Sequence, residues 1–299
     1  MTATIFLGPS CLPHGTWRAH KGPPGDNRFF NGGERLTAQH FIWVLKNGFL
    51  LHPAVERRLS QVAAPEVVDI ATGNAIAALT LAHDHPNSKV VALDISADQY
   101  PPVWTPPANI EFGSWNFFDP VPEQFWERFD VVHVRAIYST FQGRDKAEVL
   151  EKLIKLMKPG GCLQWHECCS SLIGVLDEHS SLIDSPDLPD YFEVIDRYTG
   201  GFSSARQFDD LAQVFEAKGL VDVEKTVSKV VPHLLKHETD LVLMSMQEVM
   251  GTLRHRKEHP AEVMQKLDEA QAKMTAEAAR GKCFVYLMAV FVGRKPGGH

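Results

Sequence analysis

Cysteine is scarce in this sequence of 299 residues and is poorly placed for cross-linking. There are five cysteines, an odd number, and Cys168 and Cys169 are adjacent, which is poor geometry for a bond between them. Cys11, Cys162 and Cys283 are too scattered to form the paired pattern of a structural zinc site. The sequence therefore argues against a disulfide framework and against a metal centre, and it predicts a reducing, cytoplasmic setting.

Long apolar runs and basic blocks are also missing. No stretch of about 18 apolar residues occurs, so no membrane span is expected, and there is no basic leader followed by an apolar segment. The formal net charge is -7, and the only dense basic cluster is at residues 254–257. A basic surface able to neutralise phosphates is therefore not expected, which argues against nucleic acid as the main partner.

Glycine is sparse at the point where a dinucleotide-binding protein needs it most. Residues 66–82 read as a buried strand, a small-residue turn and a helix. The turn, residues 71–75, contains a single glycine, Gly73. A pyrophosphate needs further glycines for close approach to the backbone. Asp69, inside the strand, suits a cationic end group instead. The pattern favours S-adenosylmethionine over a nicotinamide cofactor, with an ordinary strand–turn–helix and a buried Asp69 as the alternative.

A second unit sharpens this hypothesis. Residues 89–94 read as another buried strand, which ends in Asp94, about 20 residues beyond the turn. At that spacing a carboxylate can accept hydrogen bonds from both hydroxyls of a ribose. We therefore expect a nucleoside to lie across the ends of these two strands.

The remaining pattern alternates strands with helices, which predicts an α/β protein with a doubly wound, mostly parallel sheet. Further strands are expected at residues 109–113, 129–135, 162–167, 221–231 and 283–292. Helices are expected from residue 34 to 47, after residue 53, and at residues 147–157, 190–198, 208–218, 234–251 and 260–279. The ligand of such a sheet binds at the carboxyl ends of the strands.

Domain organisation follows from the change in composition along the chain. Residues 1–33 are rich in Gly, Pro and small residues and read as an arm, and residues 34–299 form one domain. Helical segments at about 170–205 and 234–280 are expected to cap the substrate side. Methionines of the second segment would give an adaptable apolar wall, with plain core packing as the alternative; they are Met244, Met246, Met250 and Met264.

Four segments carry a family resemblance. They are Asp69 to Gly73, Asp94, Phe129 to Arg135, and Leu156 to Trp165 with its Lys-Pro-Gly-Gly turn. In this order and spacing they resemble class I S-adenosylmethionine-dependent methyltransferases, in particular the branch found in fungal secondary-metabolite pathways. Residues 35–40 and 50–53 are similar to the same branch. The resemblance covers residues 34 to 170 and implies a Rossmann-like, seven-stranded sheet whose last strand is antiparallel.

The resemblance also implies the site. Asp69 and Gly73, with Thr72 and Asn74 in the same turn, would shape the site for the methionine end of the cofactor. Asp94 would hold the ribose, Asn116 and Phe117 would flank the adenine, and Arg135 would lie where cofactor meets substrate. The sequence departs from the family at Asn74, Ala75 and Ala77, where the family turn usually continues Thr-Gly-Ile-Trp, and at Asn116, which is more often aspartate.

Histidines at strand ends are the candidate catalytic residues. His133 and His166, with Glu167 behind, could act as general bases, and a buried, hydrogen-bonded histidine is the alternative. Arg135 could pair with the cofactor carboxylate or an acidic substrate, or form a structural ion pair. Gln39 and His40 could close over the cofactor, or be the polar part of an amphipathic helix.

Three functions fit these patterns. The first is methylation of a small-molecule secondary metabolite, with oxygen as the expected acceptor. The second is a non-methylating step on the same fold, such as a dehydration, cyclisation or pericyclic reaction. The third is a non-catalytic regulator. The expected partner is a small molecule, and a homodimer is an alternative to a monomer.

Overall fold

The protein is described here by a computed structural model that covers residues 28–101, 107–141, 143–176, 182–183, 190–199, 205–256 and 259–297. Most of the predicted arm, residues 1–27, lies outside these ranges. Helix α1 begins at Arg28 and runs through Gly32 and Gly33, so residues 28–33 are helical where the sequence predicted little regular structure. The carbonyl of Gly33 accepts hydrogen bonds from the side chains of Thr37 and Asn74.

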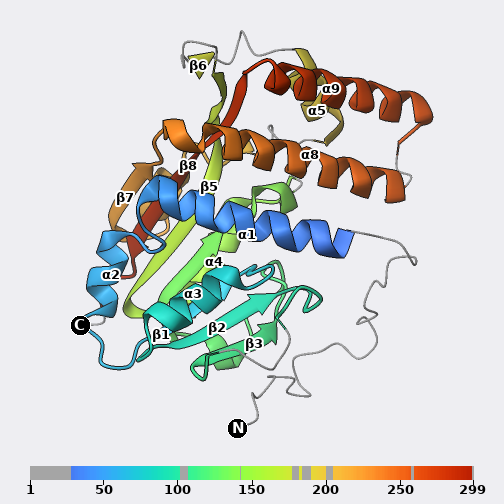
Figure 1. Cartoon of the computed structure of the whole chain (residues 1–299). Coiled ribbons are helices and arrows are strands. Elements are labelled where there is room, and N and C mark those ends of the chain that lie inside the picture. Colours follow the sequence, from blue (N-terminus) through green and yellow to red (C-terminus); the bar gives the residue numbers. More distant parts are fainter. Residues whose placement is uncertain are drawn as a thin grey trace.

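Seven strands form one sheet in the order β3-β2-β1-β4-β5-β8-β7, and two-residue β6 pairs with β5 (Figure 1). The strands are β1 Glu66–Ile70, β2 Lys89–Asp94, β3 Ile110–Ser114, β4 Phe129–Arg135, β5 Met157–Leu176, β6 Leu182–Ile183, β7 Val221–Val227 and β8 Cys283–Arg294. Strands β1 to β5 pair in parallel, and β8 lies antiparallel between β5 and β7. The predicted seven-stranded α/β sheet with an antiparallel last strand is confirmed.

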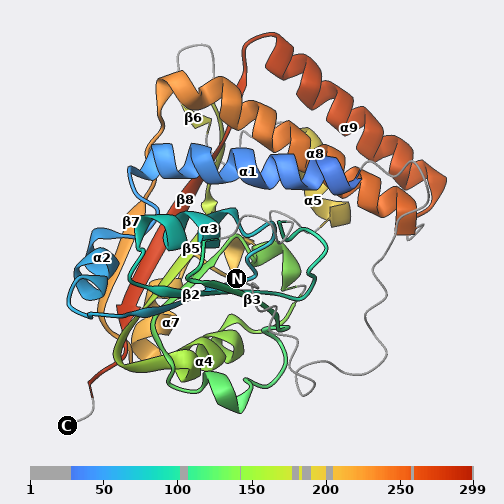
Figure 2. The same cartoon turned by 60° about the horizontal axis from the view of Figure 1, so that its bottom comes forward.

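Helices cover both faces of the sheet, as Figure 2 shows. They are α1 Arg28–Asn47, α2 Pro53–Leu59, α3 Ile76–Asp84, α4 Lys146–Leu156, α5 Asp190–Thr199, α7 Leu211–Ala217, α8 Leu235–Arg256 and α9 Ala261–Ala279. Helices α4 and α7 bury one sheet face in the larger core, while α2 and α3 bury the other. The fourth strand therefore sends Val132 and Val134 into one core and Val131 into the other.

The structure differs from the sequence-based expectation most at β5. This strand was expected to end at residue 167 but runs to Leu176, because β8 pairs with it as far as Cys283, across a register shift between Cys168 and Ile173. Residues 170–176 are therefore strand and not part of a helical segment. Strand β7 ends at Val227, four residues before the expected end.

Three helices pack together beyond the end of the sheet where β5 and β8 extend (Figure 1). Helix α8 packs on α1, on α9 and on β8, and α9 packs on α5. Met246, Met250 and Met264 lie in their shared apolar core, so packing accounts for these three methionines. No helix within the described ranges is long and apolar enough to cross a membrane.

Candidate functional site

The turn between β1 and α3 has an unusual backbone. Ala71, Gly73 and Ala75 all have positive φ angles, of 54°, 60° and 60°. Glycine adopts this left-handed region readily, whereas a Cβ atom makes it costly. The turn therefore has the conformation of a glycine-rich loop although two of its three left-handed positions are alanine.

Asp94 faces this turn from the end of β2. Its Oδ2 accepts a hydrogen bond from the Gly73 backbone N–H at 2.8 Å, and its Oδ1 accepts one from the Ser96 N–H at 3.1 Å. Burial raises the pKa of Asp94 and these backbone hydrogen bonds oppose the rise. The spacing that the sequence indicated therefore places the carboxylate beside the turn, with further lone pairs free on each oxygen.

Asp69 makes two contacts within the chain. One carboxylate oxygen lies 2.6 Å from Nδ1 of His133, and the other accepts a hydrogen bond from the Thr72 hydroxyl at 2.5 Å. Both Asp69 and His133 are buried. Asp69 thus links His133 to the turn, and its predicted contact with a cationic ligand group stays a prediction.

One face of the sheet carries a row of polar side chains. Asp69 and His133 are neighbours across β1 and β4, and Arg135 and His166 are neighbours across β4 and β5. Because residues two apart in a strand share a face, His133 and Arg135 point to the same side. Nε2 of His133 and Nε2 of His166 are buried and have no hydrogen-bond partner in the described part of the chain.

Helix α1 covers this row. A Cβ added to Gly73 would lie 3.1 Å from Cδ1 of Leu36. The Asn74 side chain donates hydrogen bonds to the Gly33 carbonyl at 3.0 Å and to the Thr37 hydroxyl at 2.9 Å. The amide of Asn74, which was predicted to contact the cofactor, therefore joins the turn to α1 through two hydrogen bonds.

Two residues of α1 that the sequence singled out are buried here. Nε2 of His40 lies 3.3 Å from the Thr80 hydroxyl of α3, and its Nδ1 has no partner among the described residues. Burial and then the charge of Arg135 lower the pKa of His40 to about 4, so the ring is neutral at pH 7. Gln39 accepts a hydrogen bond from Arg35 at 2.7 Å.

Arg135 has no ion pair or hydrogen bond to the described residues. Its guanidinium carbon lies 5.7 Å from the centre of the Trp43 ring, which also packs against His166 at 5.0 Å. Burial and then Arg135 hold the pKa of His166 well below its usual value. Trp43 was missed by the sequence reading, although its spacing of four from Gln39 places both on one face of α1.

Glu167 lies on the opposite side of β5 from His166, because successive residues of a strand point to opposite faces. It accepts hydrogen bonds from the backbone N–H groups of Ile137 and Cys168 and from the Trp165 ring. Burial raises the pKa of Glu167 to about 7 against the effect of these donors. Glu167 therefore fixes the chain just after β4 and does not contact His166.

The two residues predicted to flank an adenine lie just past β3. Oδ1 of Asn116 accepts a hydrogen bond from the Phe118 N–H at 3.1 Å, and Phe117 is buried with its ring 4.4 Å from that of Phe118. No hydrogen bond or ring contact joins either residue to the row under α1, as far as the described residues show. The preceding residue, Trp115, donates its backbone N–H to the Asp94 carbonyl at 3.1 Å, so Asn116 and Phe117 follow the strand end beside Asp94, and their contact with an adenine stays a prediction.

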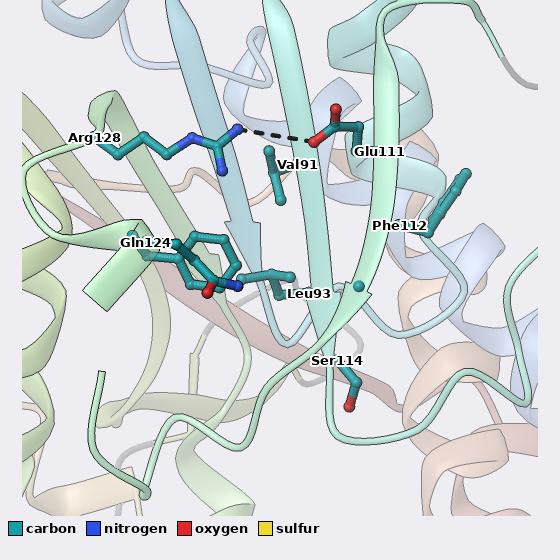
Figure 3. Close-up of a pocket in the computed structure, with 9 residues that line it drawn as sticks. Val91, Leu93, Glu111, Phe112, Ser114, Gln124 and Arg128 are labelled. Atoms are coloured by element: carbon teal, nitrogen blue, oxygen red, sulfur yellow. Dashed lines mark ion pairs between the residues drawn. The ribbon is translucent and has the colours of Figure 1, made fainter. Parts of the chain in front are cut away.

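A small hollow beside β3 is separate from this row. Figure 3 shows Val91, Leu93 and Ser114 on its wall, with Glu111 and Arg128 paired at 3.8 Å. Its volume of about 20 Å³ has room for about one water molecule. None of the predicted site residues lines it.

The strand order and the antiparallel β8 define the class I methyltransferase fold, a Rossmann-like arrangement. Among solved structures, a protein assigned as a methyltransferase of an antibiotic biosynthesis pathway in Anabaena variabilis has a TM-score of 0.51 with this chain. The likeness covers 80% of this chain and 94% of that one, at 13% sequence identity. It supports the fold alone.

Sequence comparison finds relatives in fungi. The chain is 28% identical over 139 residues to the N-methyltransferase verN of Clonostachys rogersoniana, which is 46% of this chain and 45% of that protein. It is 29% identical over 154 residues to the methyltransferase grgD of a Penicillium species, which is 48% of this chain and 50% of that protein. The N-methyltransferase tcpN of Claviceps purpurea is 28% identical over 165 residues, which is 54% of this chain and 58% of that protein. No family model matches.

These comparisons confirm the resemblance to fungal methyltransferases that the sequence motifs indicated. The matched region is about half the length of each of these curated relatives.

Proposed function

We propose that this protein is an S-adenosylmethionine-dependent methyltransferase acting on a nitrogen atom of a small secondary metabolite. The observation that carries the proposal is the carboxylate of Asp94 held against the left-handed turn by the Gly73 N–H. The turn and the acid follow two adjacent parallel strands, at the edge where this class of sheet binds a nucleoside.

The residues present fit this cofactor. Asp94 keeps lone pairs for ribose hydroxyls, and Arg135 is a cation without an ionic partner among the described residues. Buried imidazole nitrogens without partners lie on the same face, and buried polar groups of this kind call for a ligand. Asn116 and Phe117 would flank the adenine only if the ligand extends as far as β3.

The cofactor supplies a methyl group on a positively charged sulfur, so the chain mainly has to align donor and acceptor. His133 and His166 have unpartnered Nε2 atoms and are the candidate acceptors for the proton that the nucleophile loses. Asp69 would hold the His133 ring in one orientation during this transfer.

We propose nitrogen as the acceptor atom in place of the oxygen that the sequence led us to expect. Two of the relatives are named N-methyltransferases, and none of those reported above is named for transfer to oxygen. Because the matched region covers only about half of each relative, their acceptors support this choice without fixing the substrate.

The first experiment is calorimetric titration of the full chain with S-adenosylmethionine and S-adenosylhomocysteine. We expect micromolar binding, about -8 kcal/mol. Asp94→Asn keeps an acceptor for the Gly73 N–H but removes the charge, and should weaken binding about tenfold or more. Asp98→Asn, on the exposed loop after β2, is the matched control and should bind like wild type.

A second measurement follows the tritiated methyl group from the cofactor into a panel of amines, amides and phenols. Labelled amine or amide products that disappear in Asp94→Asn would support transfer to nitrogen. Absence of binding to both nucleosides, in protein whose fold is verified by circular dichroism, would refute the proposed function.

A further inference from the structure

The outer face of α1 is apolar where a surface helix is expected to be polar. Its inner face places Leu36, His40 and Trp43 against the body of the protein, so the opposite face is expected to carry polar side chains. Phe41 and Leu45 lie there instead, with exposed fractions of 52% and 63%. They are four residues apart and therefore share one face of the helix. Two large apolar side chains exposed side by side favour contact with a partner.

A hollow lies beside this apolar pair, on the same side of the sheet. The loop after α1, the first half of α2 and the end of α3 form its walls, and its volume is about 420 Å³. Phe49 of its lining is four residues beyond Leu45, and Figures 1 and 2 both show the end of α1 next to α2 and α3. The apolar lining residues are Phe49, Leu50, Leu51, Pro53 and Leu81.

Contacts between α1 and α3 place Phe41 relative to the hollow. Nε2 of His40 lies 3.3 Å from the Thr80 hydroxyl, and the ring of Phe41 packs edge-on against the His40 ring at 5.0 Å. Asp84, which lines the hollow, is about one helical turn beyond Thr80 on α3. Phe41 therefore lies beside the helix whose end forms one wall of the hollow.

The rim of the hollow carries two opposite charges. Within the described ranges Arg57 is exposed and has no ion pair, and Asp84 pairs only with the adjacent, exposed His83 at 2.8 Å. Two other lining residues, Glu56 and His85, pair with each other at 3.4 Å. The rim is therefore complementary to a partner that brings a cation to Asp84 and a carboxylate to Arg57.

We propose that this surface is the interface of a homodimer with twofold symmetry. In such a dimer one patch meets its own copy, so the patch must carry both members of every contact. The apolar pair and the hollow are one such set, and Arg57 with Asp84 is the other. Phe41 and Leu45 enter the partner's hollow, and Arg57 meets Asp84 of the partner subunit.

A lipid surface is the competing occupant of exposed apolar side chains. Binding to an anionic membrane relies on basic side chains around the apolar ones. This rim is mixed in sign, and the chain has a formal net charge of -7, so a second copy fits the patch better. Helix α1 then contacts the candidate site with one face and the partner with the other. No residue of the patch belongs to the row of polar side chains under α1, so the inference does not rest on the proposed function.

The first test is sedimentation velocity of the full chain across the micromolar range, where the wild type should pass from monomer to dimer. Leu45→Glu places a charge in the apolar contact and should raise the dissociation constant of the dimer about tenfold or more. Ile95→Glu is the matched control, because Ile95 is 62% exposed on the loop after β2. It should dimerise like the wild type, and circular dichroism verifies the fold of both variants.

The second test exchanges the charges of the rim. Arg57→Glu brings two carboxylates together at each symmetric contact, and Asp84→Arg brings two cations together. Each variant by itself should therefore dimerise about tenfold or more weakly than the wild type. An equimolar mixture of the two should dimerise again, because one contact of the mixed dimer is the native pair and the other is the same pair reversed.

Three results would overturn the proposal. The first is a wild-type chain that stays monomeric across the whole range, which would leave another protein or a lipid as the occupant. The second is a Leu45→Glu variant that dimerises as well as Ile95→Glu. The third is a pair of charge variants whose mixture forms no more dimer than either variant does separately. None of these measurements uses a nucleoside, so the proposed function stands or fails independently.

Discussion

Asp69 is fully buried and its carboxylate nevertheless stays charged. Burial by itself raises the pKa of Asp69, but the adjacent His133 and the hydroxyl of Thr72 outweigh burial and lower it. The charge then fixes a proton on Nδ1 of His133 at 2.6 Å. One side chain thus fixes the orientation of a neighbouring ring, which a motif centred on an acidic residue does not reveal.

The alanines of the turn give a prediction about stability. Ala71 has a φ of 54°, a conformation that costs an L-residue about 1–2 kcal/mol. Ala71→Gly should therefore raise the free energy of unfolding by about 1 kcal/mol, after allowance for the greater freedom of glycine in the unfolded chain. Urea unfolding followed by circular dichroism measures the change.

The same substitution inside a helix is the matched control. Ala78 lies within α3 and is buried, so Ala78→Gly should lower the free energy of unfolding by about 1 kcal/mol or more. If both glycine variants were destabilised equally, the left-handed alanine would not be strained.

At the scale of elements, α1 is held by two ion pairs with α8. Arg35 pairs with Glu248, and Lys46 pairs with Glu238, so the two helices run antiparallel. The second pair is almost completely buried, and the Lys46 ammonium also donates to the Tyr286 carbonyl at 2.9 Å. The cover over the site is therefore one unit made of α1 and α8.

Breaking the buried pair should be strongly destabilising. Lys46→Met leaves the Glu238 carboxylate buried without its partner, which costs about 3–5 kcal/mol. Thermal and urea unfolding should show this loss, and the double variant Lys46→Met with Glu238→Gln should recover much of it.

The exposed pair of Arg254 and Asp268 provides the comparison. Both side chains are about half exposed, so Arg254→Met should cost at most about 1 kcal/mol. A similar loss in Lys46→Met and Arg254→Met would contradict the special role of the buried pair.

Elements with strong local patterns were predictable. The bounds of β2 and β4 match the sequence prediction because buried parallel strands are continuous apolar runs. The start of α1 and the length of β5 could not be predicted, because each depends on contacts with a segment that is distant in sequence. Gly33 stays helical under contacts from Asn74, and residues beyond 167 stay extended because β8 pairs with them.

For the candidate site too, only the features with a local sequence pattern could be predicted. Asp94 lies beside the turn as its spacing indicated. The contact of Asp69 with His133, 64 residues away, and the place of Trp43 depend on strand order and on the packing of α1. Neither can be read from a local pattern. The ligand contacts of all these residues stay predictions.

For the whole molecule, the neutral histidines predict how stability depends on pH. The pKa of His40 falls from 6.5 to about 4 on folding, mainly through burial. Between these values the unfolded chain binds more protons than the native protein, so this contribution to stability is lost as pH falls from 6.5 to 4. His166 acts in the same direction.

Urea unfolding between pH 4 and 7 tests this prediction. His40→Phe should flatten the decline by up to about 1.4 kcal/mol per pH unit in that window. The exposed ring of His83 is the control, and His83→Phe should follow the wild-type curve. A variant at His40 whose slope equals that of wild type would show that this ring does not contribute.

The pairing of α1 with α8 has a further consequence for folding. Arg35 and Glu248 are 213 residues apart, and Lys46 reaches a carbonyl 240 residues away. Strands β1, β2 and β3 close much shorter loops, so their pairing is entropically cheaper and should come early. The row of polar side chains under α1 therefore stays open to water until the last third of the chain has folded, and ligand binding should appear as the slowest phase of refolding.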